Sequence, residues 1–323
     1  MDFGYVLAGQ YLPEDDPQQR FMEAVEQVRA ARAAGFTSIW ATQHFLADFQ
    51  FMQPMPFLAR LAAEAEGLAL ITAITIAPLY PVALLAEEVA TLDVITGGRF
   101  VLGVGAGYRD VEFDAFGAVK SRRFRVLSET ISLLRELWSG DVVQRSIGDQ
   151  RFDDVRMTMP PIQREALPIW VGAQGPRGIR IAAEDGDEWL ISPEVPLPTI
   201  VERRRTYEDA LPDGVSLAQK TLPTIREAFV AHNRDDAERI AGDALRTKYA
   251  AYASWGHDVG TFEDMVSDSF LLGSVDDCID DVKRYRDEAG TSTLGLRMQW
   301  PGLGQKQVLE SIEACADVIS NFH

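Results

Sequence analysis

Two periodicities of apolar residues alternate along this chain of 323 residues. Short apolar runs predict strands, and stretches with an apolar residue every three or four positions predict helices. Residues 3–8 form the first predicted strand, and residues 17–34 predict an amphipathic helix that ends at Gly35. Residues 70–77 are apolar on both faces, which is typical of a parallel strand buried on both sides.

The same alternation continues through the rest of the sequence. The remaining predicted strands cover residues 36–41, 99–105, 168–173, 187–191, 222–231 and 293–298, and helices are predicted between them. Alternation of strands and helices implies a parallel sheet. Eight strand–helix units favour an α/β fold of the TIM (β/α)8 barrel type over an open, doubly wound sheet, which is the alternative.

Residues 1–323 are expected to form a single TIM-barrel domain, because no long polar linker divides the sequence. Residues 141–168 are polar and interrupted by prolines, so they predict an insertion in the barrel, with a hairpin as one possible form. Residues 254–270 contain glycine and aspartate and are expected to form a loop. A long loop of this kind is a candidate lid over a site at the strand ends.

Composition narrows the class of protein. Hydrophobic residues make up 46% and charged residues 25% of the chain, as in soluble globular proteins. The net charge of −18 argues against nucleic acid and anionic membranes as partners. The two cysteines, Cys278 and Cys315, are far apart, which suits a reducing compartment. No signal-peptide pattern or membrane-length apolar run is visible, so a cytoplasmic location is expected.

Two single residues follow predicted strands, where active sites of barrels lie. His44 follows the second strand and is either an acid/base group or a buried structural histidine. Arg297 lies at the end of the eighth strand and shares a strand face with Gln299, facing the barrel interior. A buried arginine needs an anionic partner, which is either a substrate or a neighbouring carboxylate. No histidine or cysteine pair has metal-site spacing, so no metal is predicted.

Two glycine-rich segments follow other strands. Residues 103–108 (GVGAGY) allow a flat or bulky group to approach the backbone, or they allow close packing at the barrel rim. Residues 172–178 (GAQGPRG) open a helix, whose free N–H groups favour an anion, and Arg177 adds a guanidinium suited to phosphate. The alternative for this second segment is a tight turn with a solvated arginine.

Three blocks of sequence resemble the luciferase-like monooxygenase family. The first block covers residues 92–108 (LDVITGGRFVLGVGAGY) and continues to residue 117. The second block includes residues 168–172 (PIWVG), and the third includes residues 297–302 (RMQWPG). Together with His44, the resemblance covers nearly the whole chain.

This resemblance implies a TIM barrel with an insertion that holds a flavin or deazaflavin across the strand ends. It places a non-prolyl cis peptide near Thr72 and Ala73 behind the flavin ring, and the cofactor phosphate near the loop after the fifth strand. It implies that His44 lies beside the flavin. The implied catalytic residues are His44, Tyr108 and Arg297. The implied cofactor-binding residues are Thr72, Ala73, Ala106, Gly107, Tyr108, Gln174, Gly175, Arg177 and Gly178.

Two positions depart from the family pattern. The luciferases have an arginine for the phosphate where this chain has Ala106, and Arg177 is the candidate replacement. Many relatives have glutamate before the histidine, where this chain has Gln43. Both departures leave FMN and coenzyme F420 open as cofactors.

The first functional hypothesis is a two-component monooxygenase that uses O2 and reduced FMN from a separate flavin reductase on a small organic substrate. The alternatives are hydride transfer by an F420-dependent oxidoreductase, with Arg122, Arg123 and Arg125 receiving the polyanionic tail, and a non-catalytic flavin-binding protein. The aromatic and methionine residues between positions 45 and 57 either form a substrate wall or pack in a homodimer, which is common in this family. The substrate itself is not predicted.

Overall fold

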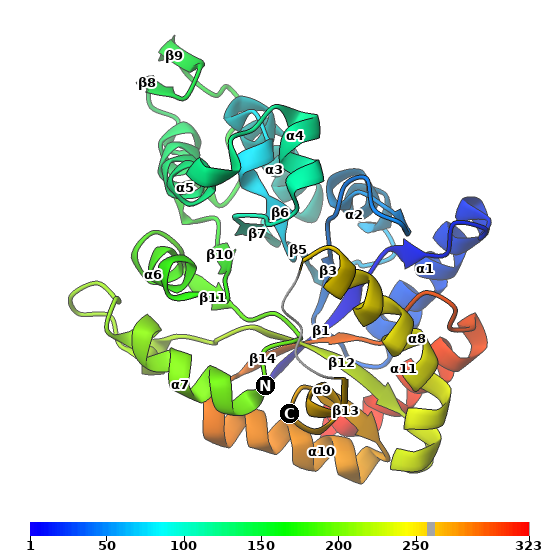
Figure 1. The fold of residues 1–323 in the computed structure, drawn as a ribbon. Coiled ribbons are helices and arrows are strands. Elements are labelled where there is room, and N and C mark those ends of the chain that lie inside the picture. Colours follow the sequence, from blue (N-terminus) through cyan, green and yellow to red (C-terminus); the bar gives the residue numbers. More distant parts are fainter. Residues whose placement is uncertain (257–261, 323) are drawn as a thin grey trace.

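The computed structural model describes residues 1–256 and 262–322. Its centre is a curled parallel sheet with the strand order β11-β10-β7-β5-β3-β1-β14-β12-β13, and β6 pairs with β7 beside β5 (Figure 1). The strands of this sheet are β1 (Asp2–Leu7), β3 (Ser38–Ala41), β5 (Ala69–Thr72), β6 (Thr75–Ile76), β7 (Phe100–Gly105), β10 (Ile169–Gly172), β11 (Glu188–Leu190), β12 (Thr224–Val230), β13 (Phe270–Gly273) and β14 (Thr293–Arg297).

The β11 edge of the strand series meets the start of β12 at Ile191, directly after β11. Ile191 bridges Thr224 at the start of β12, its N–H donates to Pro223 O (2.8 Å), and its carbonyl accepts from Ile225 N–H (2.9 Å). These bonds close the ring through β12 and β14 to β1, so the predicted TIM barrel is confirmed.

The structure adds β13, which the sequence analysis missed. This strand pairs in parallel with the second half of β12, from Glu227 opposite Phe270 to Val230 opposite Gly273. Its four residues are short and apolar, and they stand between a segment expected to be a loop and the capping box at Ser274. A run this short carries no periodicity. The expectation of a loop over residues 254–270 was wrong from Phe262 onward, where a helix (Phe262–Asp268) and then β13 follow.

The third predicted strand is divided in two. β5 and β6 both pair with β7. Ile71 stands opposite Val101 and Thr75 stands opposite Val104, so the segment from Ile71 to Thr75 has one residue more than the segment of β7 that it faces. The Thr72 hydroxyl fills the gap, since it donates to Gly103 O (2.8 Å) and accepts from Gly103 N–H (2.9 Å). The bond from Ala73 to Ile74 is cis, one residue beyond the expected position.

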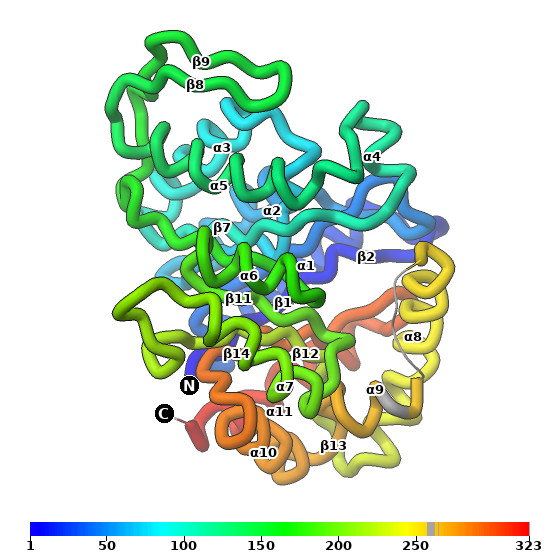
Figure 2. Tube along the Cα trace, turned by 60° about the vertical axis from the view of Figure 1, so that its left-hand side comes forward, coloured from blue at the N-terminus to red at the C-terminus, as the bar shows by residue number. Residues whose placement is uncertain are grey.

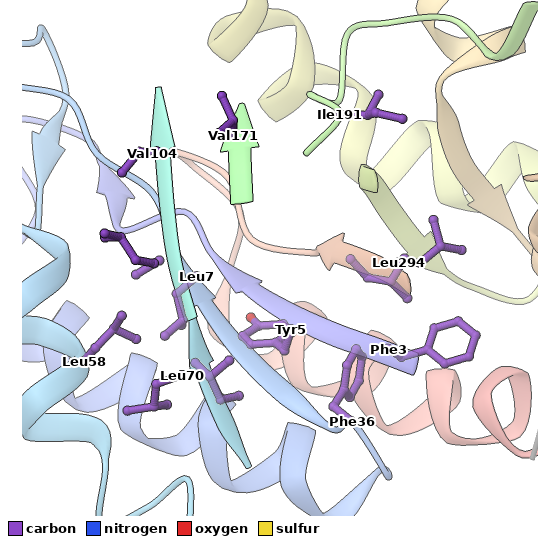
Figure 3. Packing of buried hydrophobic residues seen from close by; sticks show 14 of the residues in the cluster. Phe3, Tyr5, Leu7, Phe36, Leu58, Leu70, Val104, Val171, Ile191 and Leu294 are labelled. Atoms are coloured by element: carbon purple, nitrogen blue, oxygen red, sulfur yellow. The ribbon is translucent and has the colours of Figure 1, made fainter. Parts of the chain in front are cut away.

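Helices cover the outer face of the sheet (Figure 1). They are α1 (Pro17–Ala33), α2 (Pro54–Leu61), α3 (Val82–Thr96), α4 (Asp110–Phe116), α5 (Arg123–Ser139), α6 (Pro176–Glu184), α7 (Leu197–Glu208), α8 (Arg234–Ser254), α9 (Phe262–Asp268), α10 (Val275–Arg284) and α11 (Gln305–Ser320). The main core lies between the sheet and this layer, where Phe3, Tyr5 and Leu7 of β1 point to the helices (Figure 3). In the described residues no helix is long and apolar enough to cross a membrane.

Two smaller sheets lie outside the barrel. β2 (Gln10–Tyr11) and β4 (Gln50–Phe51) pair near the strand ends. β8 (Val143–Ile147) and β9 (Gln150–Val155) form an antiparallel hairpin within the polar segment 141–168, at the edge of the molecule (Figure 2). The candidate lid, residues 254–270, contains α9, and its residues 257–261 lie outside the described residues.

A tryptophan fills the barrel interior. Trp40 packs edge-on against Trp170, with ring centres 5.3 Å apart. A Cβ on Gly4 would lie 2.1 Å from Trp40 Nε1, and a Cβ on Gly295 would lie 2.6 Å from Trp40 Cζ3. These two glycines therefore make room for the indole, and free space remains at the C-terminal ends of the strands.

Candidate active site

A cavity of about 440 Å³ opens at the C-terminal ends of the barrel strands. Of the residues that the sequence analysis singled out, the cavity is lined by His44, Ala73, Ala106, Gly107, Tyr108, Gln174, Gly175, Gly178 and Arg297. Thr72 lies directly behind the wall, bonded to Gly103. Arg177 is exposed and lies outside this lining.

One end of the cavity is formed by the start of α6. Gly175 caps this helix without a side-chain hydrogen bond, and Pro176 follows it. The next backbone N–H groups have no acceptor within the helix, which makes the helix start favourable for an anion. A Cβ on Gly178 would lie 2.9 Å from Ala173 Cβ, so glycine is required where α6 meets the cavity wall.

Two arginines flank Phe124 at the same end. The guanidinium carbons of Arg123 and Arg177 lie 4.5 Å and 5.1 Å from the Phe124 ring centre. Arg123 and Phe124 line the cavity, whereas Arg177 does not. From the sequence, Arg123 was expected only as part of a basic patch with Arg122 and Arg125, because position along a helix does not reveal which residue of a cluster faces a cavity.

The wall beside this end is flat and apolar. The Ile74 side chain packs against the backbone of β7 and β10, where a Cβ on Gly105 or Gly172 would lie 2.9 Å or 2.8 Å from it. Gly107 has a φ of +71°, and a Cβ there would lie 2.6 Å from Ile76 Cγ2. These glycines therefore make room for the Ile74 and Ile76 side chains, and the resulting apolar wall lies next to the anion site. The donor set at α6 and the glycine surface together fit a flavin with a phosphate group.

His44 is held by a buried carboxylate. His44 Nδ1 lies 3.1 Å from Glu112 Oε1, and the same oxygen accepts from Phe45 N–H (3.0 Å) and from Arg109 Nη1 (3.2 Å). Arg109 also donates to the carbonyls of Phe45 (2.6 Å) and Leu46 (3.2 Å), which fixes the loop after β3. A carboxylate only accepts, so the proton lies on Nδ1 of His44.

The pKa of Glu112 reflects this environment. Burial raises the pKa of Glu112, but the hydrogen bond and charge of His44, the Phe45 N–H and the charge of Arg109 bring it below its ordinary value. Glu112 therefore stays ionised at neutral pH and orients the imidazole. Glu112 and Arg109 were not expected as site residues. Their only signal in the sequence is a spacing of three directly after the glycine-rich segment, with Arg109 at the N-cap of α4 and Glu112 in its first turn.

Aromatic rings surround His44. Its ring centre lies 5.3 Å from Phe51, 5.8 Å from Tyr108, 5.7 Å from Tyr252 and 5.3 Å from Trp255. Burial raises the pKa of Tyr108 well above its ordinary value, so this phenol stays protonated. The imidazole therefore lies in a largely apolar surrounding.

Gln43 explains one departure from the family pattern. Its Oε1 accepts from Ile76 N–H (2.8 Å), and its Nε2 donates to Tyr80 Oη (2.7 Å) and Gln53 Oε1 (3.2 Å). A carboxylate cannot donate, so an amide suits this position. Gln43 joins the loop after β3 to the cavity wall at β6.

Arg297 lies in the barrel interior, as predicted, and its partner is a neighbouring carboxylate. Its Nε and Nη2 donate to Glu227 at 3.1 Å and 2.7 Å. Lys248 and Trp300 also donate to Glu227, and Tyr249 Oη does so at 2.8 Å. Burial raises the pKa of Glu227, but the charges of Arg297 and Lys248 lower it to about 2. No sequence pattern indicates this cluster, because its members come from β12, α8, the end of β14 and the segment after it.

Within residues 1–256 and 262–322, no group of three histidine, cysteine, aspartate or glutamate residues could hold a metal ion. Cys278 and Cys315 are free and buried.

The comparisons with known proteins identify the family. The luciferase-like monooxygenase family matches residues 1–292, and this chain belongs to it. The resemblance inferred from the three sequence blocks is therefore confirmed.

Relatives within this family differ in cofactor. The oxygenase component of a flavin-dependent trigonelline monooxygenase from Acinetobacter baylyi is 26% identical over 243 residues, which cover 74% of this chain and 67% of that protein. An F420-dependent glucose-6-phosphate dehydrogenase from Amycolatopsis mediterranei is 26% identical over 254 residues, which cover 75% of each chain. These relatives are oxidoreductases, which supports the same general class for this chain.

A solved structure agrees in fold. The crystal structure of a monooxygenase from Streptomyces bottropensis matches 100% of both chains with a TM-score of 0.89 at 23% identity. This likeness supports the barrel fold.

Proposed function

We propose that this chain is the oxygenase component of a two-component FMN-dependent monooxygenase, which uses reduced FMN and O2 on a small organic substrate. One observation carries the proposal: the cavity joins a compact anion site, at the start of α6 beside Arg123, to a flat glycine-lined wall. FMN has this combination of a single terminal phosphate and a planar ring.

The residues that would hold FMN follow from the lining. The N–H groups at the start of α6 and the Arg123 guanidinium would bind the phosphate. Ala73 and Ile74 would support the ring. When bound, reduced FMN supplies the electrons with which O2 is activated.

The protein's own contribution is proton handling and water exclusion. Glu112 holds the Nδ1 proton of His44 and orients the imidazole, so His44 is the candidate group for proton transfer in the cavity that it lines. Tyr108 stays neutral and can donate a hydrogen bond. The aromatic rings around His44 would exclude water from the part of the cavity beside it. Exclusion of water prevents hydrolytic side reactions of a reactive intermediate.

Coenzyme F420 is the second candidate, because basic residues adjoin Arg123. Two of them already have carboxylate partners: Lys120 Nζ lies 2.8 Å from Asp110 Oδ1, and Arg125 Nε lies 2.8 Å from Glu129 Oε1. Less unpaired positive charge is therefore available for the polyanionic tail of F420 than the sequence suggests. This difference favours FMN. A non-catalytic flavin-binding protein is the third candidate, and unchanged turnover of His44→Ala would support it.

The proposed system needs a flavin reductase that supplies reduced FMN from outside this chain. We expect a homodimer in the cytoplasm, where reduced flavin can be produced continuously. Size-exclusion chromatography with light scattering checks the oligomeric state.

Oxygen uptake tests the proposed function. The purified protein, a flavin reductase, NADH and FMN are mixed with a panel of small organic acids and phenols, and oxygen consumption and product are measured. The proposal expects product formation that requires FMN and O2 together. Product formation under anaerobic conditions with reduced F420, and none with FMN, would establish the second candidate instead.

A further inference from the structure

Arg297 presents a donor edge to the cavity. Its side chain is only 3% exposed, and it belongs to the cavity lining. Both of its hydrogen bonds go to Glu227 and use Nε and Nη2. Nη1 makes no hydrogen bond with any residue that the structure describes. Nη1 is also not one of the fully enclosed polar atoms that lack a partner, so it is accessible and can donate to a ligand in the cavity.

The surroundings of Glu227 fix this edge in place. Glu227 is fully buried and receives Lys248, Tyr249 and Trp300 in addition to Arg297. The fork of Arg297 therefore cannot rotate without breaking a bidentate pair. The remaining donor is held ready for a ligand, which reduces the entropy lost when a ligand binds.

The charges at this end favour an anion. Lys248 and Arg297 share Glu227. Burial and the charge of Arg297 lower the pKa of Lys248 to about 7, so Arg297 is the cation of this cluster that stays charged at neutral pH. The cavity lining as a whole contains two arginines, Arg123 and Arg297, and one carboxylate, that of Glu194. Glu194 accepts a hydrogen bond from Gln174. A charge-assisted hydrogen bond to an anionic oxygen is about twice as strong as a neutral one.

This donor lies apart from the expected phosphate site. Arg297 ends β14, whereas the anion site at α6 follows β10, and β11 and β12 lie between these strands in the ring. Tyr252 and Ile225, which also line the cavity, give the β14 end an apolar character. The end at β14 therefore suits a small molecule with an apolar body and one anionic group.

We propose that the β14 end of the cavity binds the carboxylate or phenolate oxygen of the substrate through Arg297 Nη1, so that the substrate is a small organic anion. This inference rests on the proposed function for its reaction, but not for its binding step. Arg297 is then a substrate-binding residue, and Glu227 is a positioning residue that acts through it.

Calorimetric titration with benzoate and with benzamide tests this proposal, since the two probes differ mainly in charge. We expect benzoate to bind the wild-type protein at least tenfold more tightly. Arg297→Gln should abolish this preference, and Arg123→Gln, at the α6 end, should retain it. The surface variant Arg125→Gln serves as a control for net charge.

Equal affinity for the two probes, no binding of benzoate, or loss of the preference in Arg123→Gln alone overturns the proposal. Because Arg297→Gln leaves Glu227 with fewer partners, Arg297→Lys is a second variant that keeps the charge but lacks the fork. In Arg297→Lys, the affinity for benzoate relative to benzamide should also fall at least tenfold, and circular dichroism should show a native fold. The titration uses neither flavin nor O2, so its failure is distinct from failure of the oxygen-uptake test.

Discussion

At the scale of single residues, the pair of His44 and Glu112 carries most of the proposed chemistry. A histidine at the end of a strand is an ambiguous observation in a sequence. The structure places its Nδ1 against an ionised, fully buried carboxylate, 3.1 Å away. This contact distinguishes an oriented acid/base group from a histidine that only fills space.

Glu112→Gln tests this pair. We expect kcat/KM to fall about 10- to 100-fold, because the amide removes the charge that stabilises a protonated imidazole. The acidic limb of the pH–rate profile should also move to lower pH. Steady-state kinetics between acidic and neutral pH measure both effects.

Asp110→Asn is the matched control, since Asp110 lies on the same helix and its side chain is 80% exposed. It should leave the pH–rate profile unchanged. If Glu112→Gln lowers the rate without moving the profile, then Glu112 has only a structural role.

The sequence identified His44 and Arg297 because the ends of barrel strands are a general location for active sites. It did not identify Glu112, Glu227 or Lys248, whose importance depends on partners distant in sequence. Arg177 shows the opposite case: its place at a helix start was evident, but the structure turns it onto Phe124 outside the cavity lining.

At the scale of elements, the junction of β5, β6 and β7 shapes the cavity wall. Thr72 replaces backbone pairing with two hydrogen bonds to Gly103. A Cβ on Gly103 would lie 1.8 Å from the Thr72 carbonyl oxygen, which is far inside contact distance.

Gly103→Ala should therefore lower the free energy of unfolding by about 3 kcal/mol or more, since backbone must move to admit the methyl group. Gly242→Ala is the matched control. Gly242 lies within α8, and a Cβ there meets nothing within 4 Å. That change should raise the free energy of unfolding by about 0.5–1 kcal/mol through helix propensity. Urea denaturation measures both, and equal effects would contradict the role assigned to Gly103.

Helix α8 is joined to the barrel through Glu227. Glu227→Gln leaves the charges of Arg297 and Lys248 without their carboxylate, so we expect the free energy of unfolding to fall by about 3–5 kcal/mol. Glu263→Gln is the control: this carboxylate lies 3.4 Å from Arg246 in an exposed pair and should have no measurable effect.

The same residue predicts a pH dependence of stability. The pKa of Glu227 is about 2 in the folded protein, below its ordinary value of 4.5. Its contribution is therefore fully present above pH 4.5 and is lost as the pH falls from 4.5 towards 2. The wild-type protein should lose more stability over this range than Glu227→Gln. Parallel pH dependences of the two proteins would contradict the assignment.

At the scale of the whole molecule, alternation of strands and helices was sufficient to predict the closed barrel. Each parallel strand needs a crossover, and eight such units return to the first strand. The sequence did not predict β13, because four apolar residues have no measurable period. It did not predict the break in the third strand either, since Thr72 makes side-chain bonds where the sequence implies a continuous ladder.

The central claim is that the cavity binds FMN with its phosphate at α6. Anaerobic titration with reduced FMN and reduced riboflavin, for the wild-type protein and Arg123→Gln, tests it most directly. We expect the wild-type protein to bind FMN at least tenfold more tightly than riboflavin. Arg123→Gln should weaken FMN binding to the level of riboflavin and leave riboflavin binding unchanged. Equal affinities in the wild-type protein, or tighter binding of reduced F420 than of FMN, would contradict the claim.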